Sequence, residues 1–215
     1  MGKLVLATIT ISGSAKWLLK VGGNKEKWYG SDRIFMYVMT VFGAMTVNYS
    51  EQCTEYGWVV SNLRLLAGCL LAGGLLSAAY MDRRNCWVYN YVWWWCLPWA
   101  GILGMTAGGG FHGIVAVLVF VMLQQLLFSR MYGKADCHAF SVCALAECGN
   151  AVGMVGFLLQ MFLSVVLLTI VQLFRGNVTP RGRLREPQPF IPYIITAFFS
   201  VTFLESVFRT TYIYA

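Results

Sequence analysis

Long apolar segments, separated by short connections that carry nearly all the lysines and arginines, constrain this chain more than any other feature. A helix needs about 20 mostly apolar residues to cross a hydrocarbon layer of about 30 Å. Only 12% of the residues are charged and 58% are hydrophobic, whereas soluble domains carry about 25% charged residues. The sequence therefore predicts an all-α, polytopic transmembrane bundle of about six to seven spans. The apolar runs cover approximately 34–48, 57–80, 88–107, 113–129, 137–150, 152–174 and 189–209.

The positions of the basic residues predict the topology of this bundle. Lysines and arginines gather before residue 34, around 83–84, around 130–134 and within 175–185. Cytoplasmic connections of membrane proteins carry such an excess, so all these segments are expected on the cytoplasmic side. Topology thus accounts for the net charge of +7, and no nucleic-acid partner is expected. Residues 1–33, an apolar stretch interrupted by serines and lysines, are expected to form a cytoplasmic or interfacial segment, and 34–215 a single membrane domain.

Two of the three aspartates of the chain, Asp82 and Asp136, stand where an apolar run meets a basic cytoplasmic connection. A carboxylate at a membrane border can simply be solvated. Two carboxylates at the same membrane face can also converge, and a close pair cannot both ionise, so one holds a proton while the other remains a base. Such a pair can activate water for peptide hydrolysis.

Three short motifs sharpen this interpretation. The chain reads Gly133-Lys134-Ala135-Asp136 at the second aspartate. Asp82 is followed by two arginines and, near the next apolar run, by Asn90. The last apolar run opens with Pro189-Phe190-Ile191-Pro192, which by itself is also a common way to start a helix. In this order, the motifs resemble those of the type IV prepilin peptidases, which are membrane aspartic proteases with a GxGD motif.

The resemblance implies that Asp82 and Asp136 are the catalytic pair of an aspartic endopeptidase. It implies a prokaryotic cell-membrane protein that removes the leader peptide of prepilin-like, single-helix membrane substrates at the cytoplasmic border of the bilayer. Larger family members carry a domain with paired CxxC motifs, linked to N-methylation of the product. The seven cysteines of this chain form no CxxC pair, so a short form without the methyltransferase domain is expected.

Two residues depart from the family pattern. Ala135 replaces the second glycine of GxGD, a change that keeps the side chain small but restricts the backbone. His138 stands where the family often has lysine; it is expected to be a polar interface residue or to tune the pKa of Asp136. The histidines and cysteines show no metal-ligand spacing, so neither a metal nor an organic cofactor is expected.

Two other functions remain open from the sequence. A small transporter or channel subunit could use the border carboxylates to guide protons or cations, and a catalytically silent relative could bind prepilin-like proteins as an assembly factor. Three further charges, Arg64, Glu147 and Glu205, fall within apolar runs, where ionisable groups are usually paired. Structural pairing of Arg64 with one of the two glutamates is expected in preference to an ion path.

Overall fold

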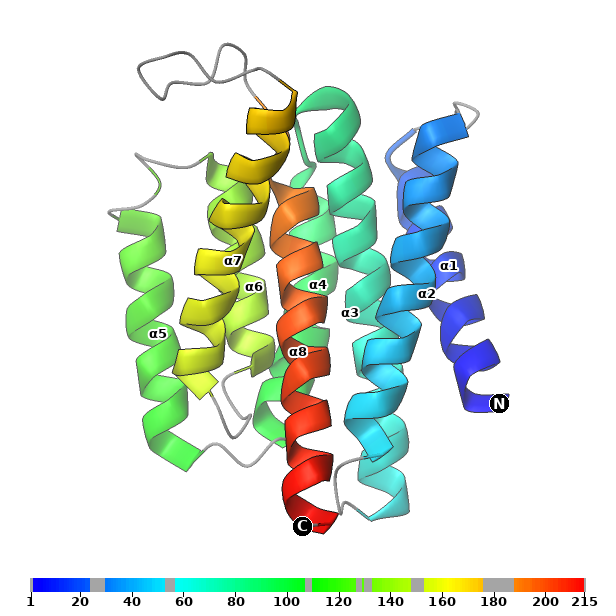
Figure 1. Ribbon diagram of the computed structural model, residues 1–215, viewed down its shortest axis with the longest axis vertical. Coiled ribbons are helices and arrows are strands. Elements are labelled where there is room, and N and C mark those ends of the chain that lie inside the picture. Colours follow the sequence, from blue (N-terminus) through cyan, green and yellow to red (C-terminus); the bar gives the residue numbers. More distant parts are fainter. Residues whose placement is uncertain are drawn as a thin grey trace.

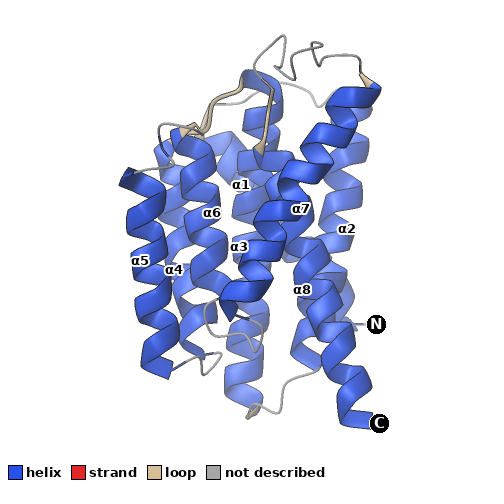
Figure 2. Ribbon diagram, turned by 60° about the vertical axis from the view of Figure 1, so that its left-hand side comes forward, coloured by secondary structure: helices blue, strands red, loops and turns tan. Residues whose placement is uncertain are grey.

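The computed structural model describes residues 2–23, 30–52, 57–106, 110–126, 129, 133–147, 153–175 and 188–214. Within these ranges it contains eight α-helices and no strand (Figures 1 and 2), so the expected all-α class is confirmed. The helices are α1 (Gly2–Val21), α2 (Gly30–Gln52), α3 (Trp58–Asn85), α4 (Asn90–Thr106), α5 (Gly110–Leu126), α6 (Lys134–Glu147), α7 (Gly153–Phe174) and α8 (Ile191–Tyr214).

Helices α2 to α8 match the seven apolar runs of the sequence one for one, whereas α1 lies in the segment that was expected outside the membrane domain. The polar residues of α1 do not interrupt the helix, because their hydroxyls bond to carbonyl oxygens of the preceding turn. Thr8 donates to Leu4 O at 2.8 Å and Ser14 donates to Thr10 O at 2.8 Å. These hydroxyls therefore need no water or partner helix to satisfy them.

Helix α1 packs against α2 and α3, so it belongs to the bundle. A Cβ added to Gly73 of α3 would collide with the side chain of Ser14, which shows that glycine permits this close approach. Two hydroxyls bond to carbonyl oxygens of α1: Ser77 of α3 donates to Ala15 O at 3.3 Å, and Tyr91 of α4 donates to Leu18 O at 2.9 Å.

Helix α3 forms the centre of the bundle. It packs against α1, α2, α4 and α8 (Figure 1), and every residue from 71 to 82 is buried. Helices α5, α6 and α7 pack against one another beside this centre, and α6 and α7 also contact α8. The C-terminal end of α3 and the N-terminal ends of α6 and α8 lie at the same end of the bundle (Figure 1).

Four of the described helices contain segments long and apolar enough to cross a membrane: Gly2–Val21, Trp58–Asn85, Val155–Phe174 and Ile191–Phe208. Large apolar side chains also remain on the surface, including Trp94 (74% exposed) and Phe162 (68% exposed), and exposed apolar surface of this extent is typical of a membrane or protein interface. Both observations suggest a membrane protein.

The expected six to seven spans are not confirmed. Helices α4 (17 residues) and α6 (14 residues) are shorter than the roughly 20 residues of a full span, and α2 carries charged residues near both ends. Most of the basic connection at 175–185, the glycines at 108–109, and two of the cysteines, Cys53 and Cys148, lie outside the described residues.

Candidate active site

Asp82 lies in the last turn of α3 and is held by the start of α8. Its side chain is only 6% exposed. The backbone N–H of Ile191 donates to Asp82 Oδ2 at 2.9 Å, and the backbone N–H of Phe190 contributes a second hydrogen bond. A buried carboxyl group without such partners would be costly. The two backbone donors therefore fix the carboxyl group in one orientation at the end of the bundle.

The sequence at the start of α8 explains why these two N–H groups are available. The first N–H groups of a helix have no partner within the helix. Pro189 and Pro192 have no N–H group at all. The N–H groups at this helix start that can donate to a side chain outside the helix are therefore those of Phe190 and Ile191. The motif that by itself indicates only a helix start thus supplies the hydrogen bonds to Asp82. Sequence reasoning placed Pro189, Phe190 and Pro192 in the site as a motif but did not predict this contact.

Asp136 lies in the first turn of α6. Its Oδ2 accepts a hydrogen bond of 3.2 Å from the backbone N–H of Gly133, the residue before the helix. The N–H of Cys137 in turn donates to Gly133 O at 3.1 Å. The Cys137 bond is the first backbone hydrogen bond of the helix, and the Asp136 bond is one half of a capping box, with aspartate in the place usually taken by glutamate or glutamine. The carboxyl group is partly exposed, so one end of it remains accessible from outside the helix.

The other residues of this motif surround the cap. Lys134 is exposed, whereas Ala135 is partly buried and packs against the core. Cys86 is the only non-glycine residue with a positive φ in the described part of the chain. Ala135 is the second residue of α6 and has no positive φ, so its backbone is helical and the position does not require the glycine of the GxGD pattern.

The two aspartates come together at this end of the bundle. The charge of Asp82 acts on the carboxyl group of Asp136, although the residues are 54 positions apart in the sequence. One turn beyond Asp136, Phe140 of α6 packs edge-on against Phe190, with ring centroids 5.8 Å apart. The start of α8 thus hydrogen-bonds to the helix of the first aspartate and packs against the helix of the second, so all three motifs meet.

Two predicted residues lie farther from this arrangement. Asn90 is exposed at the first position of α4. His138 lies two positions beyond Asp136, about 200° around the helix; its Nδ1 is 3.4 Å from Gln125 Nε2, and its ring centroid is 6.0 Å from that of Trp93. Its contacts are therefore with α5 and α4.

The third aspartate, which sequence reasoning left without a role, anchors the end of α3. Asp32 Oδ1 in the first turn of α2 lies 3.2 Å from Arg83 Nε. The guanidinium carbon of Arg83 lies 5.0 Å from the ring centroid of Phe35. Both contacts come from α2, so they fix the turn that carries Asp82.

This site offers two carboxyl groups, one buried and one partly exposed. In the described ranges, no three histidine, cysteine, aspartate or glutamate side chains come close enough to hold a metal ion. Chemically, such a pair can exchange protons with a water molecule placed between its members.

We compared the chain with protein-family models, with curated proteins and with solved structures, and none of these comparisons gave a match.

Proposed function

We propose that the protein is an intramembrane aspartic endopeptidase of the prepilin-peptidase type, with Asp82 and Asp136 as its catalytic pair. The observation that carries the proposal is the convergence of three motifs, distant in sequence, at one end of the bundle. The charge of Asp82 acts on Asp136, and the start of α8 holds Asp82 through the Ile191 N–H. A transporter would require carboxyl groups but would not require this order of motifs.

The proposed reaction needs one ionised and one protonated aspartate, the state expected of two adjacent carboxyl groups. The ionised group takes a proton from water as the water oxygen attacks the scissile carbonyl carbon, and the protonated group gives its proton to the carbonyl oxygen. The resulting diol then collapses: the carbon–nitrogen bond breaks, the nitrogen receives the first proton, and a diol hydroxyl returns a proton to the second aspartate. The products are a carboxylic acid and an amine, and the pair is restored.

The proposed setting is the cell membrane of a prokaryote, with six to seven spans and the active site at the cytoplasmic border. The basic segments around 83–84 and 130–134 flank the two aspartates, which supports this orientation under the positive-inside rule. The proposed substrate is a prepilin-like protein with one hydrophobic helix, cut where that helix leaves the bilayer. Residues 34–215 would form the peptidase domain.

Cleavage in reconstituted liposomes tests this proposal. Purified protein is combined with a panel of leader-bearing, single-helix substrates, and the product masses locate the cut. Asp82→Asn and Asp136→Asn each remove one acid with little change in shape. Glu147→Gln is the matched control, because it removes a carboxylate from the opposite end of α6, which takes no part in the proposed chemistry. We expect cleavage by the wild type and by the Glu147→Gln protein only.

The other outcomes would contradict the proposal in different ways. Substrate binding without cleavage by folded wild-type protein would favour a silent assembly factor. Ion or proton flux across the liposome membrane that depends on Asp82 and Asp136, with no cleavage of any substrate, would favour a transporter.

A further inference from the structure

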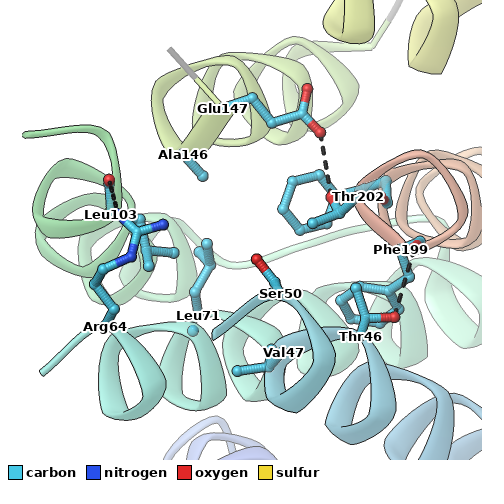
Figure 3. Close-up of a pocket in the computed structure, with 12 residues that line it drawn as sticks. Thr46, Val47, Ser50, Arg64, Leu71, Leu103, Ala146, Glu147, Phe199 and Thr202 are labelled. Carbon is cyan, nitrogen blue, oxygen red and sulfur yellow. Dashed lines mark hydrogen bonds between the residues drawn. The ribbon is translucent and has the colours of Figure 1, made fainter. Parts of the chain in front are cut away.

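Two arginines of α3 contact polar atoms on the helices beside them. Near the start of α3, Arg64 donates to Leu103 O of α4 at 3.2 Å (Figure 3) and to Thr106 Oγ1 of the same helix at 2.9 Å; its pairing with a glutamate stays a prediction. At the other end of α3, Arg83 Nε lies 3.2 Å from Asp32 Oδ1 of α2. The direction of the second guanidinium group has a chemical consequence, because the preceding residue is Asp82.

Arg83 and Asp82 are neighbours whose side chains point to different helices. Adjacent Cα atoms are about 3.8 Å apart, and adjacent side chains are separated by about 100° around a helix. The carboxyl group of Asp82 accepts a hydrogen bond from the Ile191 N–H of α8, whereas the guanidinium group of Arg83 contacts α2. An arginine side chain has many rotamers, so its direction depends on the partners that α2 provides.

Helix α2 provides two such partners, one turn apart. Asp32 supplies a carboxylate, and Phe35 supplies a ring whose centroid lies 5.0 Å from the guanidinium carbon of Arg83, within the usual range of a cation–π contact. The side chains of Arg83 and Asp32 remain 32% and 19% exposed, and ion pairs with this much exposure contribute little to the stability of a fold. The pair therefore directs the guanidinium group more than it stabilises the bundle.

The proposed chemistry explains why this direction is important. The catalytic pair must hold one proton, and a positive charge within about 4–6 Å of a carboxyl group favours its ionised form. Asp82 already accepts hydrogen bonds from two backbone N–H groups. A guanidinium group paired with it as well would favour loss of the shared proton.

We propose that Asp32 is a positioning residue of the candidate site: it holds the guanidinium group of Arg83 against α2, so that the pair formed by Asp82 and Asp136 keeps its shared proton. The consequence for catalysis rests on the proposed peptidase function. The arrangement of charges does not, and it can be measured without any substrate.

Other charged or titratable residues belong to the helix turns at this end of the bundle. They are Lys20 of α1, Arg33 of α2, Arg84 of α3, Tyr91 of α4, Lys134 and Asp136 of α6, and Tyr193 of α8. Arg84 stands next to Arg83 but donates to Tyr80 Oη at 3.1 Å. It therefore offers a matched control, because its removal changes the net charge by the same amount.

Carbodiimide labelling tests the proposal independently of cleavage. Dicyclohexylcarbodiimide reacts with protonated carboxyl groups in apolar surroundings, and mass spectrometry of the digested protein measures the labelled fraction at Asp82 and Asp136 over a range of pH. We expect Asp32→Asn to move the midpoint of labelling to lower pH by about one unit, because the released guanidinium group favours the ionised pair. Asp32→Asn combined with Arg83→Gln should return the midpoint to that of the wild type.

The matched double variant separates this effect from a loss of packing or a general change in charge. Asp32→Asn combined with Arg84→Gln should keep the lowered midpoint. An unchanged midpoint in Asp32→Asn, no recovery with Arg83→Gln, or equal recovery with Arg84→Gln would each overturn the proposal. If Asp32→Asn does not fold, Phe35→Leu replaces it: loss of the ring should cause a smaller shift in the same direction, and no shift would overturn the proposal.

The pH dependence of cleavage provides the second measurement. Loss of the shared proton ends activity at high pH, so the high-pH limb of kcat/KM should move to lower pH in Asp32→Asn and return when Arg83→Gln is added. If labelling shifts and recovers as expected but no substrate is cleaved, the role of Asp32 stands and the proposed function fails. Cleavage whose high-pH limb is the same in the wild type and Asp32→Asn would leave the peptidase function in place and overturn the role of Asp32.

Discussion

The backbone N–H of Ile191, at the first position of α8, donates a hydrogen bond of 2.9 Å to the carboxyl group of Asp82, which lies 109 positions earlier in the chain. The bond connects the third motif of the sequence to the first. It also gives the two prolines of that motif a physical role, because they remove competing N–H groups from the start of the helix. The orientation of Asp82 therefore depends on a backbone atom.

Ile191→Pro tests this dependence directly, since proline is tolerated at the first helical position and removes only one N–H group. A hydrogen bond to a charged group contributes about 1.5–3 kcal/mol, so we expect the rate of substrate cleavage to fall by roughly 10- to 100-fold. Ile191→Ala is the matched control: it loses the same buried side chain but keeps the N–H. Equal rates for the two variants would show that the side chain, and not the hydrogen bond, is important.

Gly133→Ala should disturb the second aspartate. A Cβ at Gly133 would lie 3.2 Å from Asp136 Oδ2, closer than carbon and oxygen atoms usually approach, so the carboxyl group must shift slightly. We expect cleavage to slow by several-fold, measured as kcat, with little change in the free energy of unfolding. Gly101→Ala serves as the control, because a Cβ there meets nothing within 4 Å. A Gly133→Ala protein with full activity would mean that the cap does not position Asp136.

Ala135→Gly restores the family pattern but should not raise activity. The position is helical and partly buried, and glycine in a helix costs about 0.5–1 kcal/mol relative to alanine. We therefore expect a decrease of at most about 1 kcal/mol in the free energy of unfolding, measured by denaturant titration in micelles, and an unchanged cleavage rate. A faster enzyme would indicate that alanine restrains a backbone movement needed for catalysis.

His138→Gln should leave the dependence of cleavage on pH unchanged. The imidazole contacts Gln125 and Trp93 and lies about 200° around the helix from Asp136, so its charge should have little influence on the catalytic pair. Glutamine keeps a polar group between the helices. The measurement is kcat/KM over a range of pH for both proteins. A displaced curve for the variant would support the alternative expectation that His138 tunes the pKa of Asp136.

Most of the helices could be predicted from the sequence because apolar runs and basic connections mark them clearly. Helix α1 could not, because serines and a lysine break its apolar pattern. The structure shows that hydroxyls such as that of Ser14 bond within their own helix, a solution that residue types alone do not reveal. The number of spans was also difficult to predict, since α6 has only 14 residues. Its contacts with α4, α5 and α7 could not be inferred from the length of its apolar run either.

The candidate site was predictable to a different degree for each member. Asp82 and Asp136 could be predicted to lie at the same end of the bundle, because both stand where an apolar run meets a basic connection. The role of Ile191 could not be predicted, because the group involved belongs to the backbone and any residue but proline supplies it. The two prolines, Pro189 and Pro192, which flank a pair of backbone N–H groups at the start of a helix, are the signal that could have indicated it. The contact of Asp32 with Arg83 likewise depends on packing that only the structure shows.

The central claim is that Asp82 and Asp136 act as one unit, and a double-mutant comparison of cleavage rates tests it most directly. The rate of each single Asp→Asn variant is compared with that of the protein carrying both substitutions. Residues that act as a unit have non-additive effects, so we predict that each single variant is already as slow as the double variant. Rates that fall independently, with the double variant slower than either single variant by the product of their effects, would contradict a shared catalytic pair.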